Sequence, residues 1–149
     1  MSMETVMLPI TLVTAGGAAL IALWLAIRVG QVRTKAKVSI GDGGDAALIC
    51  RMRAQANFVE YAPFIVILIG LLEFSTGTSI WLWAAGALFL LARVAHPLGM
   101  DGLKYARMVG TVVTFVLLLG LGGYAIALPL IAMQHAPAND PVEVVAPAG

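Results

Sequence analysis

Residues 53–72 read RAQANFVEYAPFIVILIGLL, a polar string that continues without a break into an apolar one. The apolar half carries no charge and suits the interior of a membrane. The polar half carries Arg53, Asn57 and Glu60, which recur at helical spacing and form one stripe along a helix. Because such side chains are too costly to expose to lipid, the stripe must face other protein. The stretch therefore predicts a membrane helix inside an all-α bundle.

The composition of the whole chain also indicates a membrane protein. Of its 149 residues, 60% are hydrophobic and only 11% are charged, against about 25% in soluble domains, which need charge to cover their surface. The net charge of +1 excludes a strongly basic nucleic-acid-binding protein. A single cysteine, Cys50, excludes an intramolecular disulfide and a cysteine-based zinc cluster. We therefore expect neither a metal site nor a nucleic-acid partner.

Three further stretches, residues 5–27, 74–92 and 108–139, lack charged residues and are long enough to cross a bilayer. The first is longer than the core of a signal peptide and has no basic residue before it, so we expect it to be retained. The chain then forms one domain, residues 1–149. Its four predicted helices lie at about residues 6–29, 45–73, 78–97 and 103–131.

The segments outside these helices are polar or rich in proline. Residues 30–44 contain three basic residues and the turn Gly41-Asp42-Gly43-Gly44, so we expect a loop there. We expect Pro129 to end the fourth helix. The tail, residues 134–149, contains three prolines and is predicted to be disordered.

All nine Lys and Arg residues lie at or near the two connections that follow the first and third predicted helices. The opposite side carries only acidic charges. The positive-inside rule therefore places both basic connections in the cytoplasm and both termini outside. Since no targeting pattern precedes the first helix, we expect a bacterial inner membrane.

A second polar pair, Arg51 and Gln55, lies on roughly the opposite face of the second predicted helix. Two polar faces on one membrane helix require two protein neighbours, which favours a bundle and an oligomer. Pro63 removes the hydrogen bond to the Val59 carbonyl, and a kink there would widen a cavity above Glu60. An ordinary membrane-helix proline is an equally good interpretation.

Further polar residues reach the same level from the other helices. Arg93 and His96 share a face of the third helix, although alone they favour a simpler interpretation as a headgroup contact and a helix cap. These polar side chains could simply form hydrogen bonds between helices, each of which contributes about 0.6 kcal/mol to stability. Because so many of them gather at one level, we favour a polar ligand pocket. One arginine from each predicted helix arrives in this layer: Arg28, Arg53, Arg93 and Arg107.

A layer of guanidinium groups with one carboxylate suits a small ligand that carries carboxylates and an amine. Arginine binds carboxylates in bidentate fashion, Glu60 can pair with an ammonium group, and Asn57 and Gln55 can satisfy amides. Glutathione has these groups. Its thiol would need a nearby cation to ionise near neutral pH, because a free thiol has a pKa of about 8.5.

The string at residues 53–63 resembles the signature of the MAPEG family, the membrane-associated proteins in eicosanoid and glutathione metabolism. It is most similar to the leukotriene synthase and microsomal glutathione transferase branches. Arg93-Val94-Ala95-His96 resembles the third-helix motif of the microsomal prostaglandin E synthase branch. The resemblance implies a four-transmembrane-helix protomer, a homotrimer, and glutathione bound between neighbouring protomers near the cytoplasmic side.

The resemblance also implies roles for single residues. Arg107 is the closest counterpart of the thiolate-stabilising arginine of the family, and Arg28 is the other catalytic candidate. Met100 replaces the tyrosine that the family has one turn after the histidine, and Ala56 replaces an additional arginine of the prostaglandin branch. The positions that match glutathione-binding residues are Arg28, Arg53, Gln55, Asn57, Glu60, Tyr61, Arg93 and His96.

We therefore expect a membrane-bound, glutathione transferase or peroxidase-like enzyme. It would activate glutathione, its co-substrate, toward a lipophilic electrophile or hydroperoxide, and its partners would be that molecule, membrane lipid and further copies of the chain. The alternative is a non-catalytic membrane protein of the same fold that binds lipid or assists a partner. A transporter or channel is disfavoured because the polar layer lies at one end of an otherwise apolar bundle.

Overall fold

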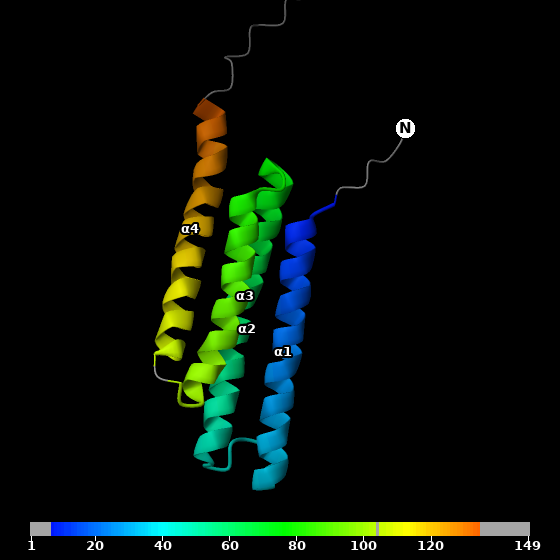
Figure 1. Ribbon diagram of the computed structural model, residues 1–149, viewed down its shortest axis with the longest axis vertical. Coiled ribbons are helices and arrows are strands. Elements are labelled where there is room, and N and C mark those ends of the chain that lie inside the picture. Colours follow the sequence, from blue (N-terminus) through cyan, green and yellow to red (C-terminus); the bar gives the residue numbers. More distant parts are fainter. Residues whose placement is uncertain (1–6, 104, 135–149) are drawn as a thin grey trace, which may run out of the picture.

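The computed structural model describes residues 7–103 and 105–134, which form four long helices (Figure 1). Each helix is long and apolar enough to cross a membrane, and the described residues contain no strand. The prediction of an all-α bundle with four membrane-spanning helices is confirmed. The helices are α1 (Pro9–Ala36), α2 (Ala46–Thr76), α3 (Ile80–Met100) and α4 (Ala106–Gln134).

The helices alternate in direction, so the α1–α2 and α3–α4 connections lie at the same end of the bundle (Figure 1). We call this the basic end, because the described Lys and Arg residues lie at or near it. The α2–α3 connection, the start of α1 and the end of α4 lie at the opposite end. Helices α1 and α4 flank the α2–α3 pair, and within the described residues they do not approach each other.

Two sequence-predicted helix ends are wrong. Helix α1 continues through Gly30 to Ala36, where we expected a loop, and ends where Lys37 adopts a left-handed conformation with φ of 56°. A single glycine costs only about 1 kcal/mol in a helix and did not stop this one. Pro129 lies inside α4, which continues to Gln134, because membrane helices tolerate an internal proline. The predicted disordered tail began at residue 134, but Gln134 is the last residue of α4; the rest of that tail, residues 135–149, lies outside the described residues.

Two helices approach α3 closely because a glycine lies at each crossing. A Cβ on Gly86 of α3 would lie 2.5 Å from Thr14 Oγ1 of α1, and one on Gly110 of α4 would lie 2.7 Å from the Ala92 carbonyl oxygen. A Cβ on Gly110 would also lie 2.9 Å from the Cβ of His96. These contacts bring the start of α4 against the end of α3, next to the residues of the predicted site.

At the end opposite the basic end, Glu73 of α2 caps the start of α1. Its side chain is only 2% exposed. Oε1 accepts hydrogen bonds from Ile10 N at 3.0 Å and Thr78 Oγ1 at 3.1 Å, while Oε2 accepts from Thr11 N at 2.8 Å and Thr11 Oγ1 at 2.7 Å. The first N–H groups of a helix have no partner inside the helix, and its N-terminus is partially positive. The Glu73 carboxylate accepts hydrogen bonds from these N–H groups, places a negative charge at the helix N-terminus, and joins α2 to α1.

Candidate functional site

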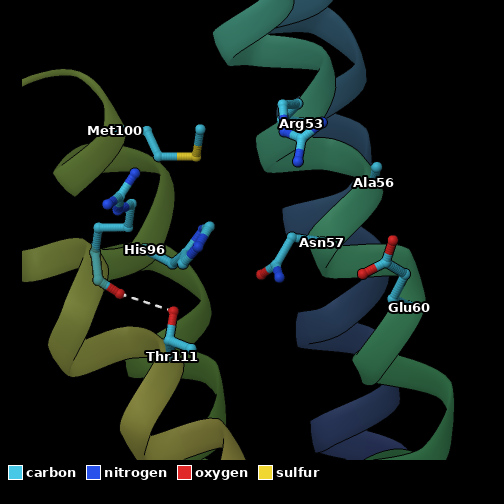
Figure 2. A pocket seen from close by; sticks show the side chains of 8 residues that line it. Arg53, Ala56, Asn57, Glu60, His96, Met100 and Thr111 are labelled. Carbon is cyan, nitrogen blue, oxygen red and sulfur yellow. Dashed lines mark hydrogen bonds between the residues drawn. The ribbon is translucent and has the colours of Figure 1, made fainter.

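A cavity of about 360 Å³ lies between α2 on one side and α3 and α4 on the other, toward the basic end (Figure 2). Its volume falls within the range of about 300–1,000 Å³ that is typical of small-molecule pockets. Its lining is polar on both sides. The lining residues are Arg53, Ala56, Asn57 and Glu60 of α2, His96 and Met100 of α3, and Arg107 and Thr111 of α4.

The α2 side of the cavity is the stripe that the sequence predicted. Arg53, Asn57 and Glu60 lie one turn after another along α2 and line the same cavity. Asn57 and His96 point toward one another across it (Figure 2). The helical spacing of the three α2 residues was therefore sufficient to find this wall.

The charged groups of the cavity have no partner in the part of the chain that the structure describes. Arg53, Glu60 and Arg107 are exposed, and none of their side chains makes a hydrogen bond or an ion pair within residues 7–103 and 105–134. Arg107 also lies in the first turn of α4, where the helix terminus is itself partially positive. The cavity thus combines two free guanidinium groups with one free carboxylate.

Arg93 lies behind the cavity wall and does not line it. It is 1% exposed, and its Nη2 donates a hydrogen bond to Asn57 Oδ1 at 2.7 Å while Nη1 donates to Thr114 Oγ1 at 3.2 Å. Its guanidinium also stacks over the Phe58 ring, 5.6 Å from the centroid. Arg93 therefore holds Asn57 in place, and the Asn57 amide N–H groups remain free for a ligand.

His96 and Met100 form the α3 side of the cavity. His96 is buried, and its Nδ1 has no hydrogen-bond partner among the described residues. Met100 places a thioether, not a phenolic hydroxyl, on the cavity wall. This part of the site therefore offers a ligand one imidazole and no tyrosine.

Three other predicted residues do not line this cavity. Tyr61 contacts the Phe115 ring of α4 edge to face, with 5.5 Å between centroids, and Gln55 is half-buried on another face of α2. Arg28 is buried on α1, where it pairs with Asp101 and lies over the Trp24 ring at 4.7 Å. The structure thus brings Arg53 and Arg107 to the cavity, and it places Arg93 behind the wall and Arg28 away from it.

Sequence reasoning missed the role of Asp101, which lies in the α3–α4 connection. Its carboxylate pairs with Arg28 of α1 and with Nη1 of Arg51 of α2, the latter at 2.9 Å. The sequence did contain one indication of this role, because Asp101 is a single acidic residue at a connection whose other charged residues are basic. No group of three or more His, Cys, Asp or Glu residues that could hold a metal ion occurs in the described ranges.

The family model of the MAPEG family matches residues 11–127, which include all of α2 and α3, most of α1 and α4, and both walls of the cavity. The chain belongs to the MAPEG family. It is therefore an integral, multi-pass membrane protein of glutathione and eicosanoid metabolism. The predicted family is confirmed, and the branch within MAPEG stays a prediction. A comparison with curated proteins gives no match.

Proposed function

We propose that this MAPEG protein is a glutathione transferase or peroxidase-like enzyme that binds glutathione in the cavity and activates its thiol. The observation that carries the proposal is the set of charges on the cavity wall that have no partner within residues 7–103 and 105–134, namely Arg53, Glu60 and Arg107. Buried or membrane-embedded charges need partners, so a cavity that leaves three of them free is built for a charged ligand. The combination requires a ligand with both negative and positive groups.

Several groups of glutathione have a counterpart in the cavity. Arg53 binds a carboxylate in bidentate fashion, and Glu60 pairs with the α-ammonium group. The Asn57 amide donates to a carbonyl oxygen of the ligand, because Arg93 already occupies its Oδ1. The ligand therefore lies along α2 and extends toward the start of α4.

Arg107 activates the thiol. Its guanidinium and the partially positive N-terminus of α4 both stabilise an anion, so the thiolate form of glutathione becomes more stable relative to the thiol. No general base is needed, because the proton leaves to water at the basic end. The thiolate then attacks a lipophilic electrophile or hydroperoxide that arrives from the bilayer.

We further propose that the chain assembles as a homotrimer, as the family resemblance implies. Arg53 and Glu60 share an exposed face of α2 with Val59, Phe64 and Ile67, each more than half exposed. An apolar face of this kind suits lipid, but its two charges do not. A neighbouring protomer would cover them, and the predicted roles of Gln55 and Arg28 would then belong to that interface.

The orientation follows from the same proposal. The basic end lies in the cytoplasm by the positive-inside rule, so glutathione enters from the cytoplasm and both termini lie outside. A bacterial inner membrane is the proposed location.

The experiment is a thiolate absorbance measurement on the purified full chain in detergent, combined with conjugation assays on several electrophiles. The wild type should bind glutathione and show the thiolate signal. Arg107→Ala should retain binding, lose the signal and lose about a hundredfold in kcat. Lys35→Ala, which removes an exposed positive charge outside the cavity at the same end, is the matched control and should behave as the wild type.

Two results would contradict the proposal. An Arg107→Ala variant with an unchanged thiolate signal would remove Arg107 from the activation step. A wild type that binds glutathione but shows neither thiolate nor conjugation would favour the non-catalytic alternative.

A further inference from the structure

Asp101 joins three helices at the basic end of the bundle. It lies where α3 ends, and its carboxylate pairs with Arg28 of α1 and Arg51 of α2. The Arg51 and Asp101 side chains are each 28% exposed, and that of Arg28 is 10% exposed. A partly shielded carboxylate shared by two guanidinium groups makes stronger contacts than an exposed surface pair.

A second link ties the same segment to α2. The Cys50 Sγ donates a hydrogen bond to the Met100 carbonyl oxygen at 3.3 Å. The Met100 side chain lines the cavity. The end of α3 is therefore fixed to α2 at two consecutive residues, Met100 and Asp101.

This connection is packed directly against the backbone of Arg107. A Cβ on Gly99 would lie 2.6 Å from the Arg107 Cα and would collide with its amide nitrogen. Gly102 completes the turn with φ of 113°, which a residue with a side chain rarely adopts. Because the two backbones are in contact, a shift of the connection moves the start of α4 and the Arg107 guanidinium with it.

We infer that Asp101 is a positioning residue for the proposed reaction: its pairing with Arg28 and Arg51 fixes the α3–α4 connection and thereby holds Arg107 at the cavity. The two arginines that pair with Asp101 do not line the cavity, whereas Arg53 and Arg107 do. This inference rests on the proposed function, because the effect of Arg107 is measured on the glutathione thiol.

The direction in which Asp101→Asn shifts the pH titration of the glutathione thiolate distinguishes a positioning role from a purely electrostatic one. Asp101→Asn removes a negative charge from the connection between α3 and α4. If charge alone mattered, the thiolate would form at lower pH, because the surroundings become more positive. If Asp101 positions Arg107, the thiolate forms only at higher pH, because its stabilising partner moves away.

The experiment is a pH titration of the thiolate absorbance of bound glutathione, with kcat and KM, on the full chain in detergent. Asp101→Asn should shift the titration to higher pH and lower kcat roughly tenfold, with KM within about twofold. Asp101→Glu keeps the carboxylate and should recover most of the loss. Asp42→Asn, which removes the same charge from the α1–α2 connection, is the matched control and should titrate as the wild type.

A readout without glutathione tests the same link. Cys50 is the only cysteine of the chain, and its Sγ is hydrogen-bonded to the Met100 carbonyl oxygen beside Asp101. If Asp101→Asn loosens the connection, a maleimide should label Cys50 several-fold faster than in the wild type. Arg51→Gln, which breaks one of the two ion pairs, should give smaller changes in the same directions and replaces Asp101→Asn if that variant does not fold.

Three results would overturn the positioning role: a shift to lower pH, an unchanged titration, or unchanged labelling of Cys50. Failure of the proposed function is distinguishable, because the wild type itself would then lack a thiolate signal. Cys50 labelling would in that case still decide whether Asp101 fixes the connection.

Discussion

Helix α2 carries two glutamates in opposite chemical situations. Glu73, at the end opposite the basic end, is buried and accepts four hydrogen bonds from α1 and from the α2–α3 connection. Glu60, on the cavity wall, is exposed and has no partner among the described residues. Both lie on a helix that crosses the membrane, where an unpaired carboxylate is costly.

We interpret the difference as that between a charge that stabilises the fold and a charge that is available to a ligand. The chain supplies every partner of Glu73 itself, so that carboxylate stabilises the fold. Glu60 has no partner among residues 7–103 and 105–134, and under the proposed function its partner is a ligand or a neighbouring protomer. The comparison therefore predicts that Glu73 governs stability and Glu60 governs binding.

The largest expected effect comes from Glu73→Ala. It removes the partner of the first N–H groups of α1 and should lower the free energy of unfolding by about 3 kcal/mol, because hydrogen bonds to a charged group are strong. Thermal unfolding in detergent measures this loss. Glutathione binding by the folded fraction should stay near the wild-type value. Equal stability of variant and wild type would show that the cap is dispensable.

Glu60→Gln should show the reverse pattern. Glutathione affinity should fall about tenfold, because the ligand ammonium loses its counter-charge. Stability should stay the same or rise, since an unpaired charge disappears. Calorimetric titration and thermal unfolding on the same preparation test both halves. A destabilised Glu60→Gln protein with normal affinity would reverse the assignment of the two glutamates.

Thr114→Val should give a mixed, smaller effect, because Thr114 supports the cavity from behind. It breaks the hydrogen bond to Arg93, which holds Asn57. We expect a loss of about 1 kcal/mol in stability and about a twofold loss in affinity. Thr34→Val on α1 is the control, because the Thr34 hydroxyl also donates to the carbonyl four residues earlier but does not line the cavity. A loss of stability with unchanged glutathione affinity would mean that the hydrogen bond between Thr114 and Arg93 does not affect ligand binding through Asn57.

Ser79→Ala should have the smallest effect. The Ser79 hydroxyl, next in sequence to the Thr78 that bonds to Glu73, is buried but has no partner in the described part of the chain. Its removal should change the free energy of unfolding by less than about 0.5 kcal/mol. A large loss of stability would indicate that the end of the bundle opposite the basic end is stabilised by the burial of side chains and not by the hydrogen bonds of Glu73.

The sequence was sufficient for features that depend on neighbouring residues. Apolar stretches predicted the four helices, and helical spacing placed Arg53, Asn57 and Glu60 on one wall. These patterns repeat within a few turns of one helix. Local signals failed at Gly30 and Pro129, because each breaks a helix only when neighbouring residues do not compensate.

The contacts that the sequence did not predict join distant parts of the chain. Glu73 meets Ile10 and Thr11 across 63 and 62 residues, and Asp101 meets Arg28 across 73. No periodicity within one helix relates such residues, and their pairing depends on how the helices are arranged. The same limit explains why the sequence did not distinguish Arg53, which lines the cavity, from Arg28, which pairs with Asp101 instead.

The most direct test of the central claim is a structure of the protein in lipid with glutathione bound. We predict glutathione in the cavity, in contact with Arg53, Glu60 and Arg107, while Glu73 keeps its bonds to α1. Glutathione bound elsewhere, with Arg53 and Glu60 paired to each other or to a neighbouring protomer, would contradict the account.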